Sequence, residues 1–313
     1  MKALKASDVA AAGVTRDRRT FLGGSDAAAV LGLSRYRTPL QVWAEKTGAL
    51  DEQNIDDKLQ VKLGKRLEEV VAELYEEKTG KKVRRVNETL YHPQFPFLAA
   101  NIDRRVVGED TVLECKTTNS FKAKEFEGEE LPPEHILQVV HYLAVTGAQK
   151  AELAVLIGNQ DFMIRTIERD ETMIARLVEK EVFFWREFVI PKVMPNVVTK
   201  YDDPVLQRLF PQAVQATLAL NDDANQLVET LQAYQQDSKQ LDGMIEQTKN
   251  ELKKLLGDHE CATSARWQVT WKNQTSTRIA SKVLREKYPD VAAAVEKESS
   301  TRVLRFKSLQ EEI

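Results

Sequence analysis

The chain has 313 residues, of which 42% are hydrophobic and 30% are charged, and its formal net charge at pH 7 is -3. This length and hydrophobic fraction allow a substantial core in about two domains, and the slightly acidic balance excludes a uniformly basic coat for nucleic acid. Because two cysteines are too few for a disulfide framework or a zinc site and no apolar run reaches about 18 residues, we expect a soluble, cytoplasmic protein without a membrane span.

The first expected element is a helix that begins after the glycine pair at positions 23–24. Ser25 opens an alanine-rich run, and the N–H groups at such a helix start can bind an anion. Ser25 can equally be an ordinary N-cap residue. Positive charge that would suit a terminal phosphate lies just upstream, at Arg16, Arg18 and Arg19.

Residues 63–80 predict an amphipathic helix with Gly80 as its C-terminal cap. Its apolar side chains recur at helical spacing: Leu63, Leu67, Val70, Val71 and Leu74. Glu68 lies beside this stripe and can reach the rim of the core, although an ordinary surface glutamate is the simpler interpretation.

Asp103, Glu114 and Lys116 form the pattern that most strongly indicates chemistry. Residues 111–117 predict a strand, on which Glu114 and Lys116 share one face. The apolar run 97–102 predicts a second strand, and a hairpin of the two would bring Asp103 to the pair. Carboxylates bind hard cations such as Mg²⁺ that activate water, and Lys116 can hold the nucleophile or neutralise charge, as in a metal-dependent phosphodiesterase. The alternative is a set of solvated charges on an exposed strand.

Residues 136–144 predict a helix after the proline pair 132–133. Gln138 and Tyr142 are four residues apart, so they lie on one side of this helix. A glutamine in so apolar a helix needs a partner, which a water, a phosphate or a core carbonyl could supply. His141 is expected to be a surface or core histidine rather than a metal ligand.

A hairpin is expected from residues 151–157 and 162–167 around Gly158, followed by a helix from about 171 to 189 with a core aromatic cluster. Prolines after residue 190 mark a boundary between domains at residues 1–200 and 205–313. The second part carries apolar residues at three-, four- and seven-residue steps, which predict a long amphipathic helix or a helical hairpin interrupted at 242–243. Residues 267–272 and 301–307 alternate like strands.

The order of these motifs along residues 16 to about 190 resembles that of the YqaJ-type viral recombinase family. That family is similar to phage lambda exonuclease and to RecB-type nucleases. The resemblance rests on the box at 23–26, the segment 34–43, Gly64 to Glu68, Asp103, Glu114-x-Lys116 and Gln138 to Tyr142. It implies a PD-(D/E)xK fold, an α/β restriction-endonuclease-like core with a central mixed sheet flanked by helices. A C-terminal helical and small β accessory region would follow.

The resemblance also implies roles for individual residues. Asp103 and Glu114 would hold metal, and Glu68 would assist them. Lys116 would position the attacking water, while Gln138 would orient the nucleophile side of the site.

At the DNA end, the resemblance assigns Arg18 and Ser25 to the 5′ phosphate and places Tyr142 among the DNA-binding residues. A local basic groove is a further expectation, and its candidates are Lys81, Lys82, Arg84, Arg85, Arg104, Arg105, Lys122 and Lys124.

The function implied is that of a Mg²⁺-dependent 5′→3′ exonuclease on double-stranded DNA ends, with Mn²⁺ expected to substitute. Such an enzyme of phage or prophage origin would leave 3′ single-stranded tails for a single-strand annealing protein and would form a homo-oligomer, with a ring as one form. The alternatives are a RecB-type endonuclease or single-strand nuclease, whose four-cysteine cluster two cysteines cannot build, and a non-catalytic recombination scaffold.

Overall fold

The computed structural model describes residues 4–5, 17–52, 54–128, 131–297 and 304–306. The chain divides into two compact units, Met1–Pro211 and Gln212–Ile313. The division lies after the expected boundary at residues 200–205, because helix α8 (Asp203–Leu209) places Val205 in the core of the first unit.

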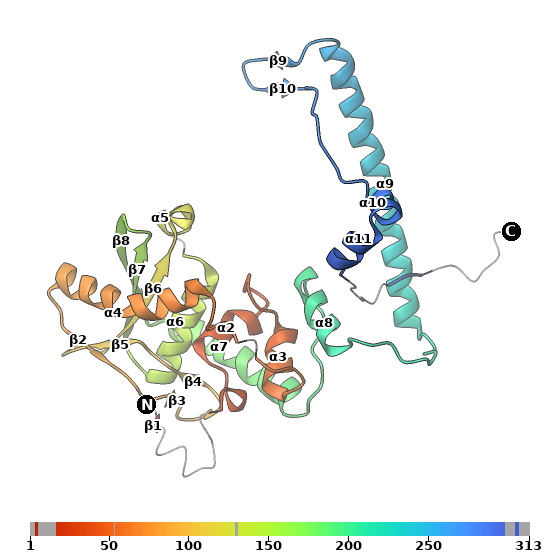
Figure 1. The fold of residues 1–313 in the computed structure, drawn as a ribbon. Coiled ribbons are helices and arrows are strands. Elements are labelled where there is room, and N and C mark those ends of the chain that lie inside the picture. The colour runs from red at the N-terminus through yellow and green to blue at the C-terminus, as the bar shows by residue number, and fades with distance from the viewer. Residues whose placement is uncertain (1–3, 6–16, 53, 129–130, 298–303, 307–313) are drawn as a thin grey trace. The chain divides into compact units, whose positions relative to one another are not determined.

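The first unit is built on a five-stranded sheet in the order β2-β5-β6-β7-β8 (Figure 1). Its strands are β2 (Val83–Arg85), β5 (Arg104–Val106), β6 (Thr111–Thr118), β7 (Lys150–Ile157) and β8 (Asp161–Glu168). β6 and β7 are parallel and the other neighbouring strands are antiparallel. A parallel pair needs a crossover, which runs through helices α5 (Lys124–Glu127) and α6 (Pro133–Thr146). The expected α/β fold with a central mixed sheet is confirmed.

Helices cover both faces of this sheet. On one face, α4 (Leu59–Thr79) packs Val71 and Tyr75 against Leu113. On the other, Val139 and Val140 of α6 share a core with apolar residues of β6 and β7. The expected alternation along β6 is therefore confirmed, because Leu113 faces α4 while Glu114 bonds to α6.

The stripe predicted for α4 is partly wrong, and so is the hairpin predicted for Asp103. Leu63 and Val70 are exposed on α4, because the sheet covers only the side that carries Val71 and Tyr75. The run 97–102 does not pair with β6; its strand β4 (Ala99–Ala100) pairs with β3 (Leu90–Tyr91), which pairs with β1 (Leu4–Lys5). The antiparallel partner of β6 is β5, which follows Asp103.

Further helices complete the first unit. They are η1 (Arg18–Thr20), α2 (Gly24–Val30), α3 (Pro39–Thr47), η2 (Ser120–Lys122), α7 (Glu171–Phe184) with its π-helical continuation η3 (Trp185–Val189), and η4 (Lys200–Asp202). The aromatic cluster expected in the core is confirmed for Phe184 and Trp185, whereas Phe183 is exposed.

The second unit contains α9 (Asp222–Leu256), a single helix that continues through Gly243 without the suggested interruption. It is followed by the antiparallel strands β9 (Cys261–Thr263) and β10 (Gln268–Thr270) and by helices α10 (Ser281–Lys287) and α11 (Pro289–Val295). Most of the strand expected at 301–307, like Arg16, lies outside the described residues. Within the described ranges, no helix is long and apolar enough to cross a membrane.

Candidate active site

Glu114, on the face of β6 that α6 covers, lies at the centre of the predicted site residues. Its Oε1 atom is 2.6 Å from the Lys116 ammonium and accepts a hydrogen bond of 2.7 Å from Gln138 Nε2. Gln138 Nε2 also donates to the Tyr142 hydroxyl at 2.8 Å, so the expected pairing of these two residues on one side of α6 is confirmed. Strand and helix periodicity together bring four predicted residues into one bonded group.

The second carboxylate oxygen of Glu114 has no such partner. Glu114 Oε2 is buried and has no hydrogen-bond partner among the described residues. Leaving a buried acceptor unpaired costs about 1–3 kcal/mol, and more for a charged group. This oxygen is therefore available to a cation or to a hydrogen-bond donor.

Asp103 lies beside Glu114, immediately before β5. Its Oδ2 atom accepts a hydrogen bond of 2.8 Å from the Cys115 backbone N–H. Burial, followed by the negative charge of Glu114, raises the pKa of Asp103 to about 8. A cation between the two carboxylates would oppose both effects.

Lys116 supplies the positive charge of this site. Burial alone would lower the pKa of its ammonium, but the charge of Glu114 and their hydrogen bond outweigh burial and raise that pKa. Lys116 therefore stays protonated at neutral pH, which suits it to charge neutralisation and to donation toward a water or phosphate rather than to proton abstraction.

The donor set fits a hard divalent cation held by two carboxylates. No group of three or more His, Cys, Asp or Glu side chains within the described part of the chain could hold a metal. Mg²⁺ needs only one or two carboxylates because it keeps several waters and takes oxygens from substrate phosphates. Asp103 with its raised pKa and the unpartnered Oε2 of Glu114 match that requirement.

Glu68 is held by arginines instead of joining this pair. Its Oε1 atom is 2.6 Å from Arg104 Nη1 and 3.8 Å from Arg85. Arg104 also bonds Glu69 at 2.8 Å and is only 2% exposed, so it is no member of a surface groove. The sequence analysis treated Arg104 only as a positive charge for a groove. Its position on strand β5, under α4, would have indicated a buried ion pair instead.

Gly24 brings the start of α2 against the same helix α6. A Cβ atom on Gly24 would lie 2.5 Å from Tyr142 Cε1 and 3.1 Å from Gln138 Cγ. Ser25, the next residue, is exposed. Arg18 is exposed too, and its Nη2 atom is 3.5 Å from Glu52 Oε1. Such a surface ion pair is weak, so another anion can replace Glu52.

The sequence assigned no role to Asp26, which the structure places in a buried ionic network. Asp26 accepts a hydrogen bond of 3.0 Å from the Gly23 N–H and is paired with Arg37 and with Lys46 at 2.8 Å. Burial would raise the pKa of Asp26, but Lys46 and Arg37 hold it well below its usual range. The network thus fixes the backbone turn that precedes Ser25.

A second group, whose contacts the sequence did not predict, follows the end of β6. Lys122 donates to the Tyr36 hydroxyl at 2.7 Å, and Arg35 bridges Glu125 and Glu134. These contacts tie the segment around Tyr36 to the residues that follow Lys116. Phe121, the residue before Lys122, is 97% exposed.

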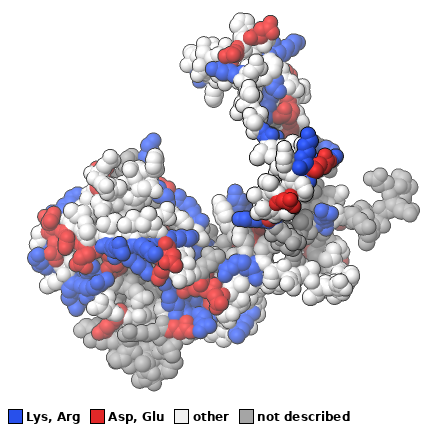
Figure 2. Space-filling model, in the orientation of Figure 1, with Lys and Arg blue, Asp and Glu red and all other residues white. Residues whose placement is uncertain are grey.

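The side chains expected to form a local basic groove largely lie beside acidic ones. Figure 2 shows lysine and arginine side chains interspersed with acidic ones over the visible face of the first unit. Several of its candidates are paired with carboxylates: Lys81, Lys82, Arg85, Arg104 and Arg105.

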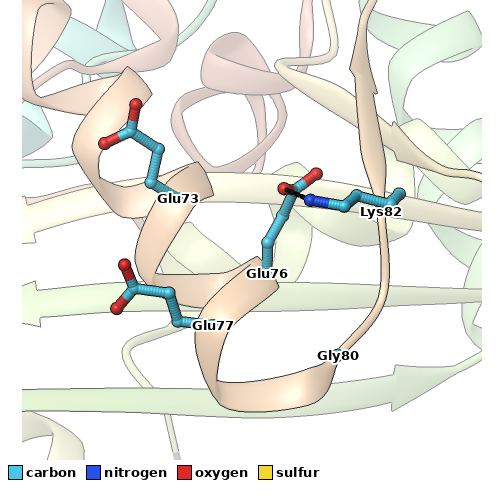
Figure 3. Close-up of a pocket in the computed structure, with 5 residues that line it drawn as sticks. All are labelled: Glu73, Glu76, Glu77, Gly80 and Lys82. Atoms are coloured by element: carbon cyan, nitrogen blue, oxygen red, sulfur yellow. Dashed lines mark hydrogen bonds and ion pairs between the residues drawn. The ribbon is translucent and has the colours of Figure 1, made fainter.

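A surface hollow at the C-terminal end of α4 is lined by residues other than those of the predicted site. It is lined by Glu73, Glu76, Glu77, Gly80 and Lys82 (Figure 3). Glu76 accepts hydrogen bonds from Lys82 and from the Val83 N–H, both at 2.7 Å, so it is satisfied internally. None of the predicted site residues lines this hollow.

Comparison with known proteins identifies similar chains. Residues 15–149 match the YqaJ-like viral recombinase domain. The chain is 34% identical over 290 residues to the "Uncharacterized protein YqaJ" of Bacillus subtilis (strain 168), with 91% of each chain covered.

Two solved structures are also similar. An alkaline exonuclease from Laribacter hongkongensis is 21% identical, covers 61% of this chain and 96% of its own, and gives a TM-score of 0.49. A phage-related exonuclease from Haemophilus somnus 129PT is 12% identical, with coverage of 55% and 95% and a TM-score of 0.40.

Proposed function

The chain belongs to the YqaJ-like viral recombinase family, and from that premise we propose that it is a metal-dependent deoxyribonuclease acting on double-stranded DNA ends. The observation that carries this proposal is the state of Glu114. One of its oxygens is held by Lys116 and Gln138, while the other is buried without a partner beside Asp103. Glu181 and Asp202 also have one buried oxygen without a partner among the described residues. Glu114 differs from them in the second carboxylate, Asp103, whose pKa is raised by burial and by the charge of Glu114.

In the proposed mechanism, Asp103 and Glu114 would hold Mg²⁺, for which Mn²⁺ would substitute. The bound cation would activate water for attack on the scissile phosphodiester and offset negative charge on the phosphate. Glu68, which is paired with Arg104, would assist because its negative charge lies near Asp103 and would favour a bound cation.

The remaining roles belong to the side chains around Glu114. Gln138 fixes the carboxylate's orientation through Oε1, which would leave Oε2 available to a cation. Lys116 keeps its proton, aligns the attacking water and neutralises charge as the phosphate is attacked. Burial, followed by the charge of Glu114, raises the pKa of Tyr142 well above its ordinary value, so its hydroxyl stays neutral and supports Gln138.

The finer features follow from the family resemblance. We propose 5′→3′ polarity, a 5′ phosphate grip by Arg18 and Ser25, and 3′ tails that pass to a phage-type single-strand annealing protein. Homo-oligomerisation, with a ring as one form, would keep the enzyme on its duplex. A RecB-type endonuclease remains the second candidate, and substrate topology separates the two.

The test uses a linear duplex and a covalently closed circle of the same sequence, each with Mg²⁺, Mn²⁺ or EDTA. We expect release of nucleotides from the linear duplex only, with either metal and not with EDTA. Labels at each 5′ and 3′ end report polarity. Cutting of the circle would favour the endonuclease, and no hydrolysis of either DNA would contradict the proposal.

The same assay examines the carboxylates. Glu114→Gln and Asp103→Asn should lower the rate by at least about a hundredfold, because each removes a charged metal ligand. Glu73→Gln on α4 is the matched control, since Glu73 is exposed and lies outside the site. Near wild-type turnover in Glu114→Gln would overturn the assignment.

A further inference from the structure

A buried lysine on α3 connects the two segments that carry Arg18 and Ser25. The Nζ atom of Lys46 lies 2.8 Å from Asp26 Oδ2, and the same ammonium donates a hydrogen bond of 2.8 Å to the carbonyl oxygen of Arg18. Asp26 Oδ2 in turn accepts a hydrogen bond of 3.0 Å from the N–H of Gly23, two residues before Ser25. One ammonium and one carboxylate oxygen therefore join the backbone of Arg18 to the turn that leads into Ser25.

The partners of Lys46 lie on different elements. Asp26 belongs to α2, whereas Arg18 begins η1 and Phe21 directly follows it. The Phe21 ring faces the ammonium, with its centroid 5.7 Å from Nζ. Because an ammonium has three N–H donors and no acceptor, these contacts are ones that a single lysine can make together. Lys46 thus holds η1 and the start of α2 against α3.

Both segments lie beside the candidate active site. A Cβ atom on Gly24 would lie 2.5 Å from the ring of Tyr142, so the start of α2 packs directly against that ring. Burial and the charge of Glu114 raise the pKa of Tyr142, and the positive charge of Arg18 is close enough to act against that rise. Tyr142 belongs to the bonded group around Glu114. The segments that Lys46 connects therefore border the carboxylates.

We propose that Lys46 and Asp26 are positioning residues for the 5′ phosphate, which hold the backbone of Arg18 in a fixed place relative to Ser25. This inference rests on the proposed function, in which Arg18 and Ser25 bind that phosphate. The side chains of Lys46 and Asp26 are only 4% and 1% exposed, so they act through the backbone and do not touch DNA. Position matters because a displacement of about 1 Å at a binding group can cost about a hundredfold in rate.

The test measures the rates at which the full chain degrades 5′-phosphorylated and 5′-hydroxyl duplexes. Methionine is unbranched and apolar, so Lys46→Met removes the ammonium while filling most of its space. We expect this variant to lower the ratio of the two rates by at least about fivefold, because Arg18 loses its anchor. A role in stability alone would reduce both rates together and leave their ratio unchanged. In an Arg18→Ala background, Lys46→Met should have no further effect on the ratio, since Lys46 acts through Arg18.

Two further variants serve as controls. Arg169→Met is matched to Lys46→Met, because Arg169 is also a largely buried cation that donates to a backbone carbonyl, that of Leu143 on α6, at 2.6 Å. It should leave the ratio unchanged even where it lowers the thermal midpoint. Lys46→Gln keeps N–H donors at this position and should give a ratio between those of wild type and Lys46→Met. If Lys46→Met does not fold, the ratio in Lys46→Gln should still fall by about twofold or more.

The outcomes separate this inference from the proposed function. An unchanged ratio in folded Lys46 variants, or an equal fall in the ratio with and without Arg18, overturns the positioning role while the nuclease assignment stands. A wild type that hydrolyses both duplexes at the same rate overturns the phosphate contact and the positioning role with it. A wild type without metal-dependent hydrolysis overturns the proposed function itself and therefore this inference as well.

Discussion

Gly24 shows how a single missing side chain allows two helices to meet at the site. The ring of Tyr142 occupies the space where a Cβ of residue 24 would lie, at 2.5 Å from that position. Because Tyr142 is only 5% exposed, its ring has little freedom to move away. Tyr142 in turn bonds Gln138, and Gln138 bonds Glu114, so a change at Gly24 reaches the carboxylate through two hydrogen bonds.

Gly24→Ala should therefore destabilise the protein by about 1–3 kcal/mol, although alanine is the better helix former. We expect kcat to fall by about tenfold or more as Gln138 moves, since 1.4 kcal/mol corresponds to about tenfold in rate. Gly23→Ala is the control, because its Cβ would lie 3.8 Å or more from its neighbours. Thermal unfolding and nuclease assays of both variants measure the effects; equal behaviour of the two would show that the close contact is unimportant.

Arg18 makes only a weak surface pair, so its charge is available to an incoming phosphate. Wild-type protein should degrade 5′-phosphorylated ends faster than 5′-hydroxyl ends, and Arg18→Ala should lose most of that preference. A charge-assisted contact of about 1.5–3 kcal/mol corresponds to tenfold or more. Arg19→Ala is the matched control, since Arg19 is engaged by Asp17 at 2.8 Å. If the wild type does not distinguish the two ends, the assignment of Arg18 and Ser25 is wrong.

Helix α6 is also held in place by a buried ionic pair. His141 Nδ1 lies 2.8 Å from Glu181 Oε1 of α7, and His141 Nε2 lies 2.9 Å from the Ala99 carbonyl oxygen. Both side chains are fully buried. His141 is therefore a core histidine, and its contacts join α6, α7 and β4.

This pair predicts a pH dependence of stability. Burial lowers the pKa of His141, but the charge of Glu181 outweighs it, so the folded-state pKa is raised above the ordinary 6.5. The stabilisation is therefore complete below about pH 6.5 and is lost as the pH rises through the folded-state pKa. His141→Gln should cost about 3–5 kcal/mol at low pH, because it leaves Glu181 buried without its partner charge, and less at higher pH.

His92 provides the opposite case. Burial lowers the pKa of His92 to about 4, so its neutral form favours the folded state and that contribution is lost as the pH falls below 6.5. Denaturant unfolding of His141→Gln, His92→Gln and wild type between pH 5 and 9 measures both slopes. The same pH trend in the two variants would contradict the assignment.

At the scale of the whole molecule, the predicted site residues all belong to one of the two units. All eight predicted site residues lie in Met1–Pro211, and the unit's core extends to Val205, which is 4% exposed. Asp202, which is fully buried, accepts hydrogen bonds from the Val198 and Thr199 N–H groups. Residues 199–211 therefore belong to the fold of the first unit.

A variant truncated after Pro211 should remain folded and hydrolyse short duplexes with metal, while a variant truncated after Val198 should be less stable. The second variant loses the buried Val205, whose burial contributes about 1.5–3 kcal/mol, and the cap formed by Asp202. Thermal midpoints and short-duplex assays compare the two. A soluble but inactive protein after truncation at Pro211 would show that the second unit completes the active site.

Much of the fold follows from local periodicity. Alternation along residues 111–117 predicts that Glu114 and Lys116 share a face, and a four-residue step predicts that Gln138 and Tyr142 meet. The cap at Gly80 and the proline pair at the start of α6 can be recognised in the same way, because each depends on neighbouring residues alone.

The arrangement around Glu114 depends on contacts between residues that are distant in the chain, which no local pattern specifies. Gln138 holds one carboxylate oxygen from 24 positions away, and Arg104 holds Glu68 from 36 positions away. The same is true of β5 as the partner of β6, since a run of three residues carries too weak a strand signal to compete with the apolar run before Asp103. Residue types and their periods predict which side chains are available to the site; packing of α6, α4 and β6 decides which oxygen of Glu114 is left for a ligand, because that choice follows from the positions of Lys116 and Gln138 in space.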